Sequence, residues 1–313
     1  MLRAGLLWLS EQPRIFRFVR RNGLARRFAS RFVAGETPET AIAACRRLAT
    51  EGGGLTASLN VLGESVSDLA EAEAARDLYL RTLAAIHSAG VPAHVSIKLT
   101  QLGLDVDERH CVANTKQVLA EAQRIGTFIR IDMEASAYAE RTLRLFREHF
   151  HPAFGDAVGV VSQTYLRRSA RDVEDLIAIK ARVRLVKGAY QEPATVAFQD
   201  KAEVDAQFER QMKRLLEAGN YPAIATHDER LIGVAKAFAA ERGIAANRFE
   251  FQMLYGVRRD LQLRLKREGF NVRVYIPFGT QWYPYLMRRL AECPANVAFI
   301  LGSIVKESVG RKR

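Results

Sequence analysis

The chain has 313 residues, of which 48% are hydrophobic and 26% charged, a composition typical of a globular protein with a large core. Lys and Arg outnumber Asp and Glu by 47 to 35, and the formal net charge of +12 favours an anionic ligand or surface. No stretch reaches the roughly 18 apolar residues that cross a bilayer, and no zinc-finger or basic aromatic pattern supports nucleic-acid binding. Cys45, Cys111 and Cys293 lie far apart and suit inert thiols in a reducing cytoplasm.

The first 50 residues are basic and have a helical pattern. Residues 1–31 contain eight arginines and one acid, Glu11. We interpret this segment as a surface helix, with a transit peptide as the secondary interpretation. Gly52, Gly53 and Gly54 then indicate a hinge before the first strand.

Short apolar or β-branched runs alternate with helical stretches along the rest of the chain. The predicted strands cover residues 55–62, 93–99, 127–134, 158–163, 182–187, 223–227, 249–254 and 271–277. The predicted helices cover residues 68–89, 112–125, 137–150, 170–180, 201–218, 230–242 and 259–268, with one more over 281–293.

This eightfold alternation is typical of parallel strands closed into a (β/α)8 barrel, which needs about 250 residues. A doubly wound open sheet is the alternative. We expect a basic helical extension over residues 1–50, a barrel over residues 51–305 and a basic tail over residues 306–313.

Polar side chains occur at or near the ends of seven of these strands. Barrel enzymes carry their chemistry at the C-terminal ends of the strands, because the loops there meet at one mouth. The excess of cations predicts an anionic ligand, such as a carboxylate or a phosphate-bearing cofactor. The residues are Lys98, Asp132, Glu134, Gln163, Arg184, Lys187, His227, Asp228, Gln252, Arg273 and Tyr275.

Several other kinds of site lack their sequence signature. No second histidine accompanies His227, so we expect no metal centre. The chain has no GxSxG nucleophile motif, and no GxGxxG motif follows a strand.

The helix after the eighth strand carries a second group of polar residues. Tyr285, Arg288, Arg289 and Glu292 have the spacing of one helical face. Adjacent arginines offer planar donors that suit a carboxylate. A solvated helix with Glu292 as an internal ion-pair partner is the other interpretation.

Nine segments together resemble the proline dehydrogenases, both the short bacterial enzymes and the corresponding domain of the PutA type. The resemblance runs from about residue 30 to residue 305. It implies a distorted (β/α)8 barrel that binds FAD, with its last helix over the mouth. One departure is Asn60, where the family usually has aspartate. The segments are LNVLGES, VSIKLTQLG, IRIDMEAS, VSQTYLRR, VRLVKGAYQEP, IATHD, FEFQMLYG, VRVYIPFG and YPYLMRRLAE.

The resemblance also implies roles for individual residues. Asp132 corresponds to the active-site aspartate, which either influences the amine proton or orients Lys98, and Arg184 to the arginine beside flavin N5. Glu292 corresponds to the acid that pairs with a helix arginine. The residues implied for proline are Lys98, Leu254, Tyr275, Tyr285, Arg288 and Arg289, and those for FAD are Met133, Gln163, Arg184, Lys187, Gly188, Ala189, Thr226 and His227.

The implied reaction is the oxidation of L-proline to Δ1-pyrroline-5-carboxylate, with electrons passed to a quinone or another respiratory-chain acceptor. A downstream pyrroline-5-carboxylate dehydrogenase and transient contact with the inner face of the membrane are further implied partners of a cytoplasmic protein. Two alternatives remain at this point. One is a flavin barrel of the methylenetetrahydrofolate reductase type, and the other is a scaffold that binds a membrane or a nucleic acid through its basic surface.

Overall fold

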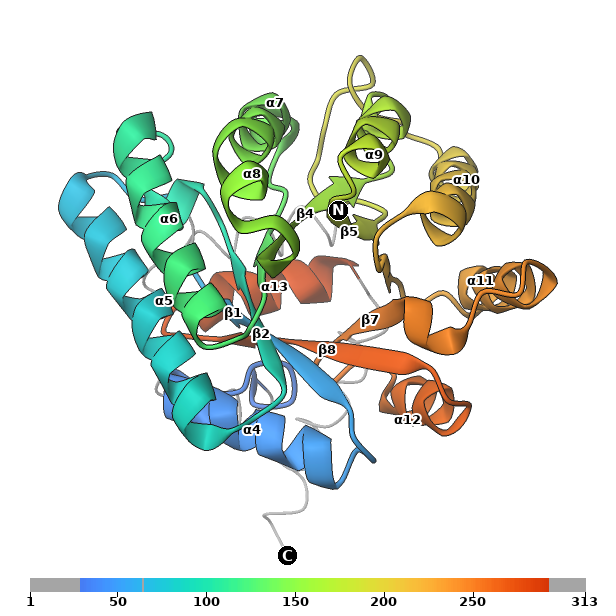
Figure 1. Cartoon of the computed structure of the whole chain (residues 1–313), viewed down its shortest axis with the longest axis horizontal. Coiled ribbons are helices and arrows are strands. Elements are labelled where there is room, and N and C mark those ends of the chain that lie inside the picture. Colours follow the sequence, from blue (N-terminus) through green and yellow to red (C-terminus); the bar gives the residue numbers. More distant parts are fainter. Residues whose placement is uncertain (1–28, 64, 293–313) are drawn as a thin grey trace, which may run out of the picture.

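Eight parallel strands form a closed barrel in the computed structural model, which describes residues 29–63 and 65–292 (Figure 1). Each strand pairs with the next, and β8 (Asn271–Phe278) pairs with β1 (Thr56–Val61) to close the barrel. The predicted fold class, a (β/α)8 barrel, is therefore confirmed. The other strands are β2 (Ala93–Ile97), β3 (Ile129–Ile131), β4 (Val158–Gln163), β5 (Arg182–Val186), β6 (Ala223–Ala225) and β7 (Glu250–Leu254).

Helices surround the strands as an outer ring (Figure 1). In four of the helices that follow a strand, the residue before the helix is an aspartate. Its side chain accepts a backbone N–H of the first helical turn. These helices are α5 (Leu69–Ala89), α6 (Glu108–Arg124), α7 (Ser136–Leu145), α8 (His151–Phe154), α9 (Ser169–Ala178), α10 (Lys201–Ala218), α11 (Glu229–Glu241) and α12 (Arg259–Arg267).

Two helices depart from the regular barrel. α4 (Pro38–Thr50) packs against β1, β8 and α5, and Figure 1 shows it between α5 and α12. It thereby fills the place that the helix after β8 has in a regular barrel. α13 (Trp282–Glu292) instead crosses the barrel in Figure 1, and its Tyr285 comes close enough to Tyr275 to influence the pKa of that phenol.

Two predicted helices differ from the observed ones by more than two residues at one end. α6 begins four residues earlier than predicted, at Glu108, because the Asp107 side chain caps it by accepting the His110 N–H at 2.8 Å. The predicted helix 137–150 is wrong in its second half, where a π-helical turn (Phe146–Phe150) leads into α8. Pro152 follows this turn and has no N–H to continue an α-helical ladder.

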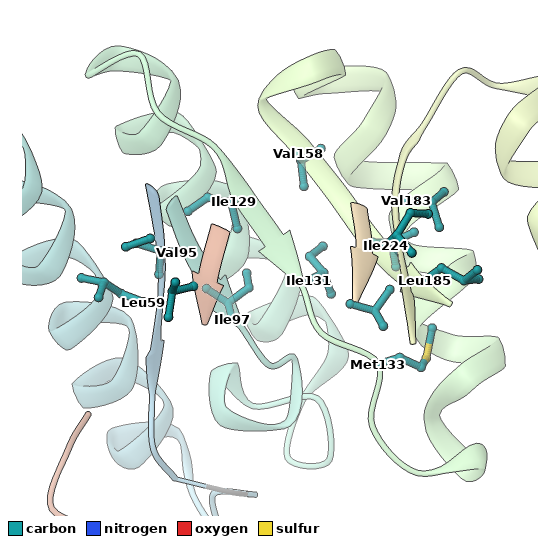
Figure 2. Packing of buried hydrophobic residues seen from close by; sticks show 14 of the residues in the cluster. Leu59, Val95, Ile97, Ile129, Ile131, Met133, Val158, Val183, Leu185 and Ile224 are labelled. Atoms are coloured by element: carbon teal, nitrogen blue, oxygen red, sulfur yellow. The ribbon is translucent and has the colours of Figure 1, made fainter. Parts of the chain in front are cut away.

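The apolar core lies between the barrel and its ring of helices. Leu59, Val95, Ile97, Ile129 and Ile131 are fully buried and belong to one cluster, shown in Figure 2. Burying each such side chain contributes about 1.5–3 kcal/mol. Alternate strand residues point to opposite faces, so the residues between these aliphatic ones face the barrel interior.

The terminal segments of the chain leave two predictions untested. Residues 1–28 and 293–313 lie outside the described part, so the predicted basic helical extension and the boundary at residue 305 stay predictions. Gly53 and Gly54 lie in the turn before β1 with positive φ, where a hinge was predicted. Among residues 29–63 and 65–292, no helix has both the length and the apolar character that a bilayer span requires.

Candidate active site

The interior of the barrel is lined by hydrogen-bonded polar side chains. Most barrels of this kind fill the same space with branched aliphatic residues. Arg184 of β5 lies at its centre and is only 5% exposed. Its guanidinium donates to Asp132 Oδ1 at 2.6 Å, Gln252 Oε1 at 2.6 Å and Ser96 Oγ at 3.0 Å. A cation buried this deeply is held in one orientation by its acceptors.

Asp132 joins Arg184 to Tyr275 in the part of this interior nearest the C-terminal ends of the strands. It follows β3 directly, and its backbone N–H donates to Ile97 O at 2.9 Å. Its second carboxylate oxygen accepts the Tyr275 hydroxyl at 2.7 Å. Burial and the neighbouring Asp132 charge raise the pKa of Tyr275 well above its ordinary value. Tyr275 therefore stays protonated and donates to Asp132.

Lys98 directly follows β2, and its side chain contacts Asn60 instead of Asp132. Its Nζ donates to Asn60 Oδ1 at 3.3 Å, so the amide at this unusual position still orients the lysine. Asp132 makes its side-chain hydrogen bonds with Arg184 and Tyr275. Of the two roles considered for Asp132, orientation of Lys98 is not supported by a hydrogen bond or ion pair between the two side chains in the described part of the chain.

Glu134 links the loops that follow β2 and β3. Its carboxylate accepts the Thr100 hydroxyl at 2.6 Å and the Thr100 N–H at 3.3 Å. Burial raises the pKa of Glu134, against the effect of those hydrogen bonds. The carboxylate fixes the loop beside Lys98 instead of facing solvent.

A second group of residues lies at or just after the C-terminal ends of β4, β5 and β6. Gln163 donates from Nε2 to Met133 O at 3.3 Å, while its buried Oε1 has no hydrogen-bond partner within the described residues. Lys187 forms ion pairs with Asp205 at 2.6 Å and Asp228 at 3.0 Å. Burial alone would raise the pKa of both aspartates, but the hydrogen bonds and charge of Lys187 hold their pKa below the usual value.

Gly188 and His227 fix the backbone around this second group. Gly188 has φ +117°, and a Cβ there would lie 2.2 Å from the Tyr165 ring, so only glycine fits. His227 Nε2 accepts the Leu254 N–H at 2.9 Å, which orients both residues. Thr226 accepts the Asp228 N–H at 3.1 Å.

The loop between β5 and α10 is fastened by Glu192, a residue that the strand-end pattern does not reveal. Its carboxylate accepts the Ser136 N–H at 2.7 Å and also the Ser136 hydroxyl. This contact joins the loop to the first turn of α7. Glu192 belongs to the segment VRLVKGAYQEP, so the signal for it was present in the sequence.

The sequence of this chain matches one protein family over most of its length. The model of the family described as "Proline dehydrogenase" matches residues 41–301. The chain belongs to the proline dehydrogenase family. A proline dehydrogenase of Deinococcus radiodurans is 41% identical over 98% of both chains. Proline dehydrogenase 1 of Bacillus subtilis strain 168 is 40% identical over 98% of this chain and all of the relative.

Solved structures of larger proline dehydrogenase relatives share the fold. Proline utilization A (PutA) of Bdellovibrio bacteriovorus, solved after inactivation by N-propargylglycine, aligns with a TM-score of 0.80 and 26% identity. The alignment covers 90% of this chain and 34% of PutA, so this chain spans about a third of that protein. A PutA of Bradyrhizobium japonicum, 24% identical with a TM-score of 0.73, agrees on the fold.

The proline dehydrogenase barrel brings most of the predicted site residues to one end. Lys98 and Asp132 directly follow β2 and β3, and Leu254 ends β7. Tyr275 lies within the C-terminal half of β8. Tyr285 of α13 is buried, with 8% of it exposed. Arg288, Arg289 and Glu292 belong to α13, but their side chains lie outside the described part, so the predicted carboxylate grip and ion pair stay predictions.

One residue predicted for the mouth lies deeper in the barrel. Arg273 donates to Glu250 at 2.9 Å and to Ala57 O at 2.9 Å, in the half of the barrel nearer the strand starts. The prediction was wrong because a strand residue's depth depends on the stagger of the strands, which its own sequence does not reveal. Glu250 also accepts Gln252 Nε2 at 2.5 Å, so hydrogen bonds run unbroken from Arg273 to Arg184.

Proposed function

We propose that this chain oxidises L-proline to Δ1-pyrroline-5-carboxylate and uses FAD as its cofactor. Membership of the proline dehydrogenase family supports the activity. The observation that carries the site assignment is the hydrogen-bonded unit of Arg184, Asp132 and Tyr275 at the barrel mouth. We assign Lys98 and Leu254 to the substrate. Lys98 directly follows β2 and Leu254 is the last residue of β7, so both lie on the mouth side of the barrel.

The residues present fit a flavin nucleotide. The unsatisfied Oε1 of Gln163 is a buried acceptor suited to a ring N–H. Gly188 lets the backbone pass where a side chain would collide. We assign Lys187, which Asp205 and Asp228 hold in place, to the polar part of the nucleotide. Met133, Ala189, Thr226 and His227 complete the residues that we assign to FAD, which when bound supplies the hydride acceptor for proline C5.

The substrate carboxylate would be held by three cations. We assign this role to Lys98, Arg288 and Arg289, since charge-assisted hydrogen bonds to a carboxylate are about twice as strong as neutral ones. Lys98 is oriented by Asn60. Tyr275, Tyr285 and Leu254 would contact the ring, which offers few polar groups of its own. Glu292 would pair with one of the helix arginines.

Arg184 and Asp132 contribute charge and orientation to the reaction. Arg184 has fixed positive charge inside the barrel, where the low dielectric strengthens its interaction with charge that develops nearby. Asp132 accepts hydrogen bonds from both Arg184 and Tyr275, so it orients two residues of the site. We therefore assign it to orientation of Arg184 and Tyr275, with any effect on the amine proton acting through its charge.

The remaining parts of the proposal concern partners and location. We propose that electrons pass to a quinone or another respiratory-chain acceptor, that the product passes to a pyrroline-5-carboxylate dehydrogenase, and that the protein is cytoplasmic. The basic segment 1–31 supports reversible contact with an anionic membrane surface. The full chain should float with anionic vesicles, and a variant that lacks residues 1–31 should not. Equal flotation of both forms would contradict this contact.

Replacement of the helix arginines tests the site assignment. Arg288→Ala and Arg289→Ala should each raise the KM for proline about tenfold or more, because a charge-assisted hydrogen bond contributes about 1.5–3 kcal/mol. The flavin content should stay unchanged. Arg267→Ala, on the exposed face of α12, is the matched control and should leave KM unchanged. Loss of flavin with an unchanged KM would refute the assignment.

A further inference from the structure

A pocket of about 280 Å³ opens at the end of the barrel opposite the mouth. It lies where α5 leads into β2 and α6 leads into β3, at the starts of the strands. Figure 1 shows α5 and α6 side by side on this flank, and the two helices pack together. We call it the basal pocket. Its lining residues are Thr56, Ile86, His87, Gly90, Val91, Pro92, Ala93, His94, Ile125, Gly126, Thr127 and Arg273.

The barrel interior beside the basal pocket has more positive than negative charge. Arg130, Arg182 and Arg273 lie in this half, and Glu250 is the carboxylate hydrogen-bonded to Arg273. Arg130 is 2% exposed, and its Nε has no hydrogen-bond partner among the described residues. The Phe128 ring lies 4.7 Å from the Arg130 guanidinium carbon and 4.2 Å from that of Arg182. Buried cations in excess of carboxylates favour an anion nearby.

Arg273 brings part of this charge to the pocket wall. It is 7% exposed, and it uses Nε for Glu250 and Nη1 for the carbonyl of Ala57. No acceptor for its Nη2 is found in the described part of the chain. A guanidinium that is already fixed by two partners loses little further freedom when it binds a third.

His94 forms a second polar part of the wall. Its ring packs on Phe128, with 4.9 Å between the ring centroids. Burial lowers the pKa of His94 well below its ordinary value, and the charges of Arg273, Arg182, Arg130 and Arg184 lower it further. The imidazole is therefore neutral at pH 7 and keeps one N–H to donate.

The rest of the lining decides what kind of anion fits. Among the described residues, no aspartate or glutamate lines the basal pocket, and Ile86, Val91 and Ile125 form apolar walls. A ligand with a charged end and a short hydrocarbon body matches this arrangement better than a phosphate, whose oxygens all need polar partners. We propose that the basal pocket binds a small aliphatic carboxylate, whose oxygens contact Arg273 and His94.

Calorimetry on the full-length holoenzyme with isovalerate as the probe tests this site. We expect a basal site with a Kd on the order of 1 mM, the affinity of a few polar contacts on a small ligand. The Arg288→Ala variant, which lacks part of the carboxylate grip that we assign to the mouth, should keep this site. Val91→Glu adds a negative charge to the wall and should weaken binding about tenfold or more. His94→Phe keeps the ring packed on Phe128 and should weaken it about fivefold, the loss of one hydrogen bond.

Two controls accompany Val91→Glu. One tests whether the added charge must lie in the pocket wall, and the other tests whether the variant is folded. Ala245→Glu adds the same charge at an exposed position before β7 and should leave binding unchanged within about twofold. Proline oxidation should be normal in Val91→Glu, which shows that the variant is folded. The proposal is overturned if isovalerate does not bind, if Val91→Glu and Ala245→Glu bind it equally, or if inorganic phosphate binds more tightly.

Discussion

Replacement of Gln252 by leucine tests whether the polar barrel interior positions Arg184. The Gln252 side chain accepts Arg184 Nε at 2.6 Å and donates to Glu250 Oε1 at 2.5 Å. It is 4% exposed, so water does not replace either contact. Leucine has a similar volume but offers no hydrogen bond, so the variant leaves both charged groups short of one partner.

The expected loss follows from these two contacts. A hydrogen bond to a charged group contributes about 1.5–3 kcal/mol, so Gln252→Leu should lower the free energy of unfolding by about 3–6 kcal/mol. Arg184 keeps Asp132 and Ser96 but loses its third anchor. Because small displacements of an oriented group are costly to catalysis, kcat/KM for proline should fall about tenfold or more.

Urea unfolding and proline-dependent dye reduction measure the two effects at equal flavin content. Gln211→Leu is the matched control, since Gln211 is 2% exposed and donates to the neutral Ser169 hydroxyl at 2.8 Å. It should cost about 0.5–1.5 kcal/mol and leave proline oxidation unchanged. A loss of less than about 1.5 kcal/mol in Gln252→Leu, with unchanged kcat/KM, would refute the positioning of Arg184 by this chain of contacts.

Three further predictions address other parts of the molecule. Tyr275→Phe removes the donor to Asp132 at 2.7 Å and should lower the free energy of unfolding by about 1.5–3 kcal/mol, measured by urea unfolding; an effect below about 0.5 kcal/mol would speak against that contact. Folding keeps His94 neutral, whereas the unfolded chain gains a proton below about pH 6.5, so stability should fall as pH drops from there by about 1.4 kcal/mol per unit. The His94→Phe variant should lose this part of the slope, and an unchanged slope would contradict the assignment. Burial raises the pKa of Cys45 and Cys111 to about 12, so in a Cys293→Ser background the native protein should resist a thiol reagent at pH 8 and react only when unfolded. Rapid native labelling would contradict their burial.

The sequence predicted the order of elements because each strand and helix has its own apolar period. The predicted strand 158–163 and helix 201–218 match β4 and α10 residue for residue. The strand 127–134 was too long, because β3 ends at Ile131 and the chain then leaves the barrel toward Glu134 and its Thr100 contact. Strand ends depend on such tertiary contacts more than on local pattern.

The candidate site was predicted in part. Lys98, Asp132 and Tyr275 could be placed at the mouth because they lie near the C-terminal ends of their predicted strands. The partners of these residues could not be deduced, since the contact of Asp132 with Arg184 joins residues 52 positions apart. The basal pocket was not predicted at all, because it requires Arg273 and His94 to meet from different strands at a depth set by the closed barrel.

The optical spectrum of the purified full-length protein, recorded without oxygen before and after addition of L-proline, tests the central claim most directly. We predict a flavin absorbance band that L-proline bleaches and that the Arg288→Ala variant bleaches only at much higher proline concentration. A protein without flavin absorbance, or a flavin band that L-proline leaves unchanged, would contradict the proposed function.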